Sequence, residues 1–260
     1  MSFFSLHKRF GSLGLAIASI FVANPLLATP LEDIQERGTI QIAVKENVRP
    51  LAFRDSAGNL QGLEIDIARR LAKELMGSDA QVELIPVKNQ ERLDLLLQGD
   101  IDLVIAQLGL NASRQRLVDF SHYYYLDGLG FVTKQANLAE AHQVTTQRIA
   151  VLNSSEAIAA VQAYFPATTL VAVNSYQEAL ASLENNQADL FVGDHSVLTG
   201  WTQDYPEYRL LPAWLEGNAL AIAIPKGDQH QSLYNEIQTI MAEWRESGWL
   251  QDRINYWGLP

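Results

Sequence analysis

The sequence predicts an α/β protein made of two similar lobes, each a mainly parallel sheet flanked by helices. The order strand–helix–strand–helix–strand, which produces a parallel sheet, occurs twice along the chain. An internal echo supports the same division, because LDLLLQGDIDLVIA from Leu93 and LASLENNQADLFVG from Leu180 share one plan. Each combines a leucine-bearing helix, a polar break and an apolar strand opened by Asp-Leu. With 260 residues, 48% of them hydrophobic, the chain can form two small cores.

The first lobe is defined by the spacing of its apolar residues. Alternation over 39–45 indicates a strand, and helical spacing over 63–76, closed by Gly77, indicates an amphipathic helix. Nearly continuous apolar residues over 101–106 indicate a strand buried on both faces. The other elements expected here are a turn at Arg54–Leu60, a strand at Val82–Val87 and a helix at Glu91–Gln98.

The second lobe repeats this plan. Its expected strands are Arg148–Leu152, Thr168–Val173 and Asp189–Val192, and its expected helices are Ser155–Tyr164 and Tyr176–Leu183. Two apolar strands, Leu129–Thr133 and Leu220–Ile224, are expected to cross between the lobes, and the tail Leu233–Trp257 is expected to be helical, with its tryptophans packed into a core. The expected division is residues 29–125 plus 219–260 for the first lobe and 126–218 for the second.

Residues 1–28 have the pattern of a cleavable secretory signal. Lys8 and Arg9 precede an apolar run at 13–23 that is too short to span a bilayer, and Ala28 is the expected last residue. An N-terminal membrane anchor is the alternative. The sequence has no cysteine, which excludes disulfides and a lipid-modified cysteine. The net charge of −11 argues against nucleic acid and anionic membrane surfaces as partners.

Candidate binding residues follow from the expected topology. In open parallel α/β sheets, ligands bind beyond the carboxyl ends of the strands. In the first lobe this rule selects Lys45, then Asn89–Arg92, then Gln107–Arg114. In the second lobe it selects Asn153–Glu156 and Asp194. If the lobes face each other at these ends, three cations and one carboxylate surround one cleft.

Each charged candidate also has a structural alternative. Lys45 and Arg92 can be solvated surface charges, and Arg114 can pair with Asp119. Asp194 can cap the helix that follows it, because aspartate is a favoured N-cap residue.

The sequence offers few signs of catalysis. There is no phosphate loop, dinucleotide glycine fingerprint or nucleophile elbow. Asp100 and Asp102 stand at the amino end of a strand, the wrong end for a ligand, and are expected to be structural. One tyrosine of the run Tyr123–Tyr125 is expected to line the cleft while the others pack. The histidines lack metal-ligand spacing and are expected to be superficial or structural: His7, His122, His142, His195 and His230.

The chain resembles the family 3 extracellular solute-binding proteins, the amino-acid receptors of ABC importers. The resemblance runs from Gly38 to Trp257 and rests on several spaced motifs in the family's order. These motifs are GTIQIAVK from Gly38, DSAGNLQGLEIDIA from Asp55, GDIDLVIA from Gly99, SRQRLVDFS from Ser113 and AIPKG from Ala223.

The resemblance implies a two-lobed periplasmic binding protein fold of type II, the Venus-flytrap arrangement, and assigns roles to particular residues. Arg114 would pair with the ligand α-carboxylate and Asp194 with its α-ammonium, which agrees with the bidentate geometry of a guanidinium. Lys45 and Arg92 stand where the aspartate/glutamate binders hold the side-chain carboxylate. The complete expected ligand-binding set is Lys45, Arg92, Gln107, Gly109, Arg114, Asn153, Ser154, Ser155 and Asp194. The family often has threonine where Gly109 stands.

The resemblance also implies a cellular role. The expected protein is a monomer in the periplasm that carries no cofactor or metal and delivers glutamate or aspartate to a membrane permease. Glutamine or another polar amino acid is an alternative ligand. An enzyme resembling cyclohexadienyl dehydratase is the alternative on the same fold, and a sensor working with a separate partner is a third class.

Overall fold

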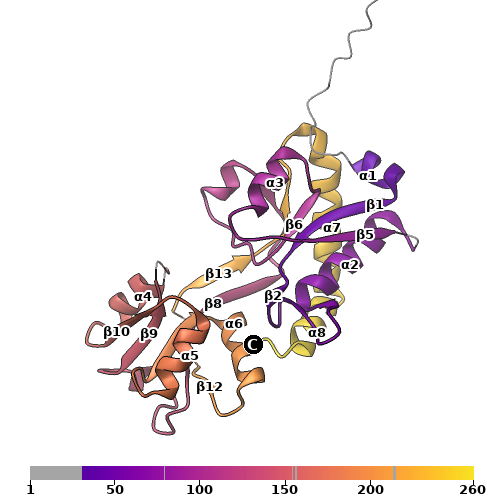
Figure 1. The fold of residues 1–260 in the computed structure, drawn as a ribbon. Helices are drawn as coiled ribbons and strands as arrows, with labels where there is room; N and C mark the ends of the chain where they lie inside the picture. Colours follow the sequence, from indigo (N-terminus) through magenta and orange to yellow (C-terminus); the bar gives the residue numbers. More distant parts are fainter. Residues whose placement is uncertain (1–30, 79, 154, 156, 213–214) are drawn as a thin grey trace, which may run out of the picture.

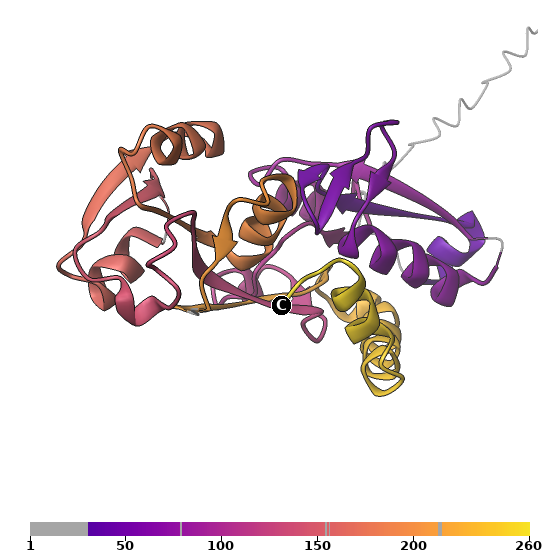
Figure 2. The same ribbon diagram turned by 90° about the horizontal axis from the view of Figure 1, so that it is seen from below.

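The structure is a computed structural model that describes residues 31–260 except 79, 154, 156 and 213–214. The described chain forms two α/β lobes with a narrow waist between them (Figures 1 and 2). The expected signal segment, residues 1–28, lies outside the described residues.

The first lobe contains a sheet with the strand order β5-β1-β6-β14-β7, in which β5, β1 and β6 are parallel. Its elements are α1 (Leu31–Arg37), β1 (Thr39–Val44), α2 (Leu63–Met76), β5 (Gln81–Pro86), α3 (Arg92–Gln98), β6 (Leu103–Ile105), β7 (Asp119–Phe120) and β14 (Ala223–Ile224). Alternate residues of β1 face opposite cores, since Ile42 packs in a cluster with α2 whereas Ala43 packs in a cluster with α3. A small antiparallel sheet joins β2 (Asn47–Val48), β3 (Ala52–Arg54) and β4 (Leu60–Gln61).

The second lobe contains a sheet with the order β10-β9-β11-β8-β12. Its elements are β8 (Tyr125–Thr133), β9 (Arg148–Leu152), α4 (Ala157–Tyr164), β10 (Thr169–Val173), α5 (Tyr176–Glu184), β11 (Leu190–Asp194), α6 (His195–Asp204) and β12 (Arg209–Leu210). The parallel strands follow the same spatial order as in the first lobe: the second strand, the first, then the third. The two echoing segments form α3–β6 and α5–β11. Their polar breaks contain left-handed residues, Gly99 (φ 79°) and Asn186 (φ 54°), that turn the chain back toward the sheet.

Two segments cross the waist. β8 pairs in antiparallel fashion with β13 (Gly217–Leu220), so Tyr125 lies opposite Leu220 and Gly128 opposite Gly217. The single strand predicted at Leu220–Ile224 is wrong. The chain changes partners there, from β8 to β6 and β7, and so forms the two short strands β13 and β14. The expected lobe boundaries fall within β8 and within β13, and the division of the chain between lobes stays a prediction.

The C-terminal segment covers the first lobe. The segment is helical as expected, with a break at Gly248 (φ 78°) that separates α7 (Gln231–Glu246) from α8 (Trp249–Tyr256). The expected packing of its tryptophans is confirmed, because Trp244 is buried in the core beneath α2 and Trp249 and Trp257 pack against the same cluster.

Helix α6 of the second lobe also contacts the first lobe at the waist. A Cβ at Gly200 would lie 2.3 Å from the carbonyl oxygen of Arg49, so only glycine allows this approach. Asp204 forms an ion pair with Arg49 at 3.6 Å, and the Gln203 side chain donates to the Trp257 carbonyl at 3.0 Å. These contacts fix the position of the helix that follows Asp194.

Candidate ligand-binding cleft

A hollow of about 480 Å³ lies between the lobes at the carboxyl ends of the parallel strands. This volume is within the usual range for small-molecule sites. Both lobes contribute to its lining, and most of the lining surface is polar. The lining residues are Asn89, Arg92, Gln107, Gly109, Leu110, Asn111, Arg114, Gly128, Leu129, Ser155, Ala157, Asp194, Glu216, Gly217 and Asn218.

Most of the predicted site residues lie in this lining, but two do not. Lys45 is buried behind it and donates from Nζ to the carbonyl oxygen of Val87 at 3.0 Å. Asn153 turns to Asn174 and donates to its side chain at 2.8 Å. Ser154 lies outside the described residues. The predicted residues brought together around the hollow are Arg92, Gln107, Gly109, Arg114, Ser155 and Asp194.

Arg114 begins a short 3-10 helix, Arg114–Arg116, on the first-lobe side of the cleft. Its guanidinium donates to the carbonyl oxygen of Gly109 at 2.7 Å, which aims the side chain along the cleft wall. Asp119, the alternative partner expected from the sequence, lies 3.7 Å from Lys226 instead. Among the described residues, no carboxylate lies within ion-pair distance of Arg114, so the guanidinium can receive an anionic group of a ligand.

Asp194 occupies the N-cap position of α6, but its side chain makes no capping hydrogen bond. That role belongs to Asp127, a fully buried residue of β8, whose carboxylate accepts from the backbone N–H of Ser196 at 3.1 Å and from its hydroxyl at 2.5 Å. Because Asp127 stabilises the start of the helix, the carboxylate of Asp194 can face the cleft. There it accepts from the Gln107 side chain of the other lobe at 3.3 Å.

The alternative that Lys45 and Arg92 are solvated surface charges is wrong. Their exposed fractions are only 8% and 6%, and this burial is the main cause that lowers the pKa of each cation. Arg92 donates from Nη1 to the carbonyl oxygens of Ala106 at 2.5 Å and Gln107 at 3.1 Å, whereas its Nε has no partner among the described residues. A desolvated cation gains more from an anionic ligand than an exposed one does.

Glu64, in the first turn of α2, is a site residue that sequence reasoning missed. It is fully buried, and its Oε1 accepts from the backbone N–H of Gln107 and from the Tyr124 hydroxyl, both at 2.6 Å. Desolvation raises the pKa of Glu64 to about 6. A signal was present in the sequence, because Glu64 precedes Ala68 by four positions and Leu71 by seven and therefore shares their buried face.

Asn218 and Glu216, on and beside β13, also line the cleft and were not predicted. A Cβ at Gly109 would lie 1.9 Å from Oδ1 of Asn218. The Asn218 amide therefore occupies the space that a side chain at position 109 would need. Glu216 adds a carboxylate, so the lining contains acids as well as Arg92 and Arg114.

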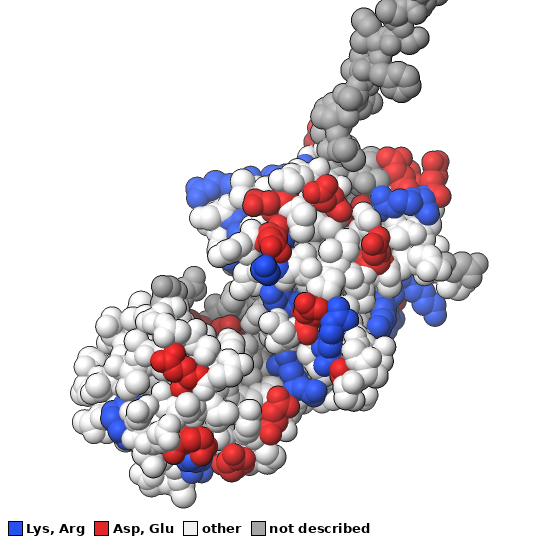
Figure 3. All heavy atoms as spheres, viewed as in Figure 1, with Lys and Arg blue, Asp and Glu red and all other residues white. Residues whose placement is uncertain are grey.

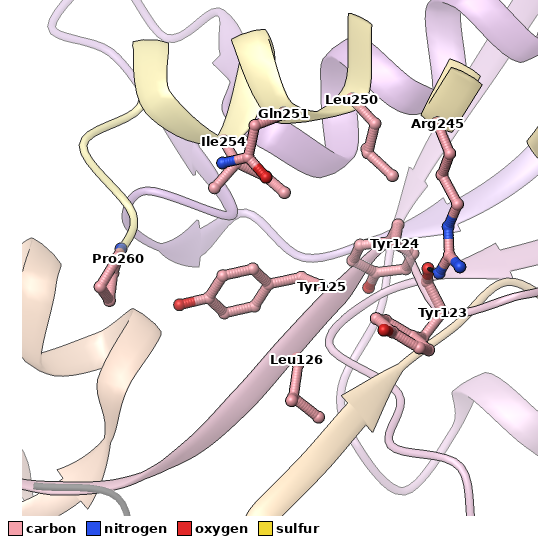
Figure 4. Close-up of a pocket in the computed structure, with 9 residues that line it drawn as sticks. All are labelled: Tyr123, Tyr124, Tyr125, Leu126, Arg245, Leu250, Gln251, Ile254 and Pro260. Atoms are coloured by element: carbon pink, nitrogen blue, oxygen red, sulfur yellow. Dashed lines mark hydrogen bonds between the residues drawn. The ribbon is translucent and has the colours of Figure 1, made fainter. Parts of the chain in front are cut away.

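The run of tyrosines does not line this cleft. Tyr123, Tyr124 and Tyr125 line a separate hollow of about 490 Å³ with Arg245 and residues of α8 and the C-terminus (Figure 4). None of them is among the described residues that line the cleft, so the expectation that one does is wrong. Tyr124 acts on the site indirectly, through its hydrogen bond to Glu64.

The remaining polar candidates are structural. Asp102 is buried at the amino end of β6 and forms an ion pair with Arg37 at 2.5 Å. His195 and His230 are each 2% exposed, which agrees with the structural interpretation of the buried histidines. Within the described part of the chain, no group of histidine, aspartate and glutamate residues could hold a metal ion.

The raised pKa of Glu64 leads to a prediction for stability. Because the folded state holds the proton more tightly than the unfolded chain, ionisation of Glu64 opposes folding. As the pH rises from about 4 to 7, the wild-type protein should lose about 2 kcal/mol of unfolding free energy relative to Glu64→Gln. Urea denaturation of both proteins across this pH range measures the difference. A difference that is constant with pH would contradict the raised pKa.

The fold and the cleft define a class: a two-lobed solute-binding protein with polar groups of both lobes facing one ligand site. The chain belongs to the bacterial extracellular solute-binding proteins, family 3, which it matches over residues 40–260. Among the described residues, no helix is both long and apolar enough to span a membrane.

Individual relatives agree with this membership. The chain is 28% identical to the glutamine-binding protein of Geobacillus stearothermophilus over 70% of each chain. It is 24% identical to the ABC transporter glutamine-binding protein GlnH of Bacillus subtilis over 87% of this chain and 84% of that one. Among solved structures, an ancestral cationic amino acid solute-binding protein matches with a TM-score of 0.74 and 24% identity, covering 87% of this chain and 98% of the other. The solute receptor for L-cysteine of Neisseria gonorrhoeae matches with a TM-score of 0.68 and 25% identity, covering 88% and 93%.

Proposed function

We propose that this protein is the periplasmic, non-enzymatic binding component of an ABC importer and that its ligand is glutamate or aspartate. Arg114 on the first lobe and Asp194 on the second provide one partner of each sign for the α-carboxylate and α-ammonium of an amino acid. A ligand held by both residues joins the lobes and favours the closed state. In this proposal the protein is exported by its N-terminal signal, acts as a monomer and passes its ligand to a membrane permease.

The observation that supports an acidic side chain is the buried cationic wall. Arg92 lines the cleft with an unpartnered Nε among the described residues, and Lys45 lies behind it. Both cations are desolvated, and removing a charge from water costs free energy. A ligand carboxylate beside them offsets part of this desolvation cost. On the face shown in Figure 3, charges of both signs are interspersed. The net charge of −11 repels an anion, so attraction of an anionic ligand depends on this local cluster.

Glutamine is the second candidate, and a specific observation favours it. Glu64 lies close enough to Lys45 and Arg92 to interact electrostatically with both, and Glu216 adds a further negative charge to the lining. These acids offset part of the cationic field, which lessens the advantage of an acidic over an amide side chain. The relatives from Geobacillus stearothermophilus and Bacillus subtilis are both named glutamine-binding proteins.

Isothermal titration with the twenty amino acids tests the ligand directly. We expect glutamate or aspartate to bind more tightly than glutamine, and arginine to bind far more weakly than any of them. Tightest binding of arginine or of an apolar amino acid would contradict the roles of Lys45 and Arg92.

Incubation with prephenate, followed by ultraviolet absorbance, tests the absence of dehydratase activity, because formation of an aromatic product would identify an enzyme.

Variants of the cationic wall should change specificity. Lys45→Ala and Arg92→Met should each weaken glutamate more than glutamine, by roughly 1.5–3 kcal/mol for Arg92, whose guanidinium can bond the ligand carboxylate, and by less for Lys45, whose charge acts through space. The effect should be larger for Arg92, because it lines the cleft and Lys45 does not. Lys88→Met is a matched control, since the Lys88 side chain is 84% exposed in the loop before α3. Equal losses for both ligands would mean that the wall affects lobe closure or stability instead.

A further inference from the structure

Glu64 holds the turn at Gln107, the residue whose side chain connects the first lobe to Asp194 on the second. Gln107 has a left-handed backbone (φ 52°), which is unfavourable for a residue with a side chain. Its N–H donates to Glu64 and its carbonyl oxygen accepts from Arg92, so the two charged residues hold this turn from both sides. The side chain of Gln107 then reaches Asp194 on the second lobe.

The second property of Glu64 is the placement of its charge. The carboxyl group is fully buried, and its Oε2 has no hydrogen-bond partner among the described residues. It faces Lys45 from the residue after β1, Arg92 from α3 and Tyr124 from the segment before β8, and it interacts electrostatically with both cations. No direct ion pair joins it to either cation within the described chain. Its charge therefore acts through space on the same cluster that faces the ligand side chain.

We propose that Glu64 is a positioning residue that sets how strongly the cleft prefers an acidic to an amide ligand, and that its protonation strengthens this preference. This inference rests on the proposed function. When ionised, Glu64 offsets the field of Lys45 and Arg92 and disfavours a second carboxylate nearby. When protonated, it can still accept from Gln107 and Tyr124, so the turn keeps its geometry while the field becomes more positive.

The selectivity ratio, Kd for glutamine divided by Kd for glutamate, tests this proposal. At pH 7.5, Glu64→Gln should raise the ratio about tenfold, the scale of a charge–charge interaction over several ångströms at the effective dielectric of a protein site. In the wild-type protein the ratio should rise as the pH falls from 8 to 5.5, whereas in Glu64→Gln it should stay flat. Free glutamate keeps its side-chain charge over this range. Burial lowers the pKa of Lys45, so the comparison with Glu64→Gln is what separates the titration of Glu64 from that of Lys45.

Proton uptake provides a readout that a purely structural role would not change. If glutamate favours the protonated form of Glu64, its binding near pH 6.5 should take up a fraction of a proton, measured by calorimetry in buffers of different ionisation enthalpy. Binding of glutamine should take up less, and the difference between the ligands should vanish in Glu64→Gln.

Tyr124→Phe removes a hydrogen bond that lowers the pKa of Glu64, so it should move the midpoint of the selectivity ratio to higher pH.

Asp102→Asn is the matched control, because it removes a buried acid from the opposite end of the same sheet. It should leave the ratio and its pH dependence unchanged. The proposal is overturned if Glu64→Gln melts near the wild-type temperature yet leaves the ratio unchanged, or if it weakens both ligands equally. If the wild-type protein binds neither an acidic amino acid nor its amide, the proposed function fails. If it binds both and the selectivity ratio does not depend on Glu64, only this inference fails.

Discussion

Replacing Asp194 by asparagine is expected to weaken glutamate binding by roughly 2–5 kcal/mol, because a desolvated ammonium loses its charged partner. The free energy of unfolding should change little, since Asp127 rather than Asp194 caps α6. Affinity for glutarate, which has no amine, should fall much less or even rise as a negative charge leaves the cleft. Titrations of both ligands into both proteins, with a melting curve for each, measure these effects.

Two further variants serve as controls for this prediction. Glu207→Gln removes an exposed acid from the segment that follows the same helix and should leave binding unchanged. Asp127→Ala should lower stability by at least the 0.5–2 kcal/mol typical of a lost N-cap. Normal glutamate binding by Asp194→Asn together with a lowered melting temperature would show that Asp194 has the capping role after all. In that case Glu46 and Glu156 are the next acids to test as ammonium partners.

Arg114→Gln should weaken every α-amino acid by roughly 2–5 kcal/mol, whatever its side chain, because the α-carboxylate loses its charged partner. This uniform loss distinguishes Arg114 from Arg92, whose replacement should change the ratio between glutamate and glutamine. Arg116→Gln is the matched control, since Arg116 is an exposed arginine of the same short helix. Titration of glutamate, glutamine and alanine into both variants measures the effect. If Arg114→Gln and Arg116→Gln bind these amino acids with similar affinity, Arg114 does not bind the α-carboxylate.

The rule that ligands bind beyond the carboxyl ends of parallel strands correctly selects residues whose position follows from the local sequence pattern. Arg92, Gln107, Arg114 and Asp194 follow strand ends, and apolar periodicity fixes where those strands stop. Because parallel strands end at the same edge of a sheet, the sequence alone predicts that these residues, far apart along the chain, surround one hollow. The same rule placed Lys45 at a strand end but could not show that it lies behind the wall.

The residues that were missed depend on distances between elements. Glu64 is part of the site because the first turn of α2 lies beneath the loop after β6, and Asp127 caps α6 because β8 passes its first turn. Asn218 fills the space at Gly109 because β13 crosses close to that loop. Hydrogen bonds of this kind span more than forty positions, and no local pattern of residue types encodes them.

Patterns in the sequence predict the class of fold, the repeated order of elements and the strand ends that surround the cleft. Local periodicity and turn chemistry decide these features, and both can be seen within short windows of the chain. The packing of the folded chain, by contrast, sets how deeply Lys45 and Arg92 are buried and which acid caps α6. It also decides which carboxylate lies against the cationic wall. Burial and electrostatic coupling depend on the packing of distant elements, so the charge balance of the cleft, and with it the ligand preference proposed for this protein, is a property of the folded chain.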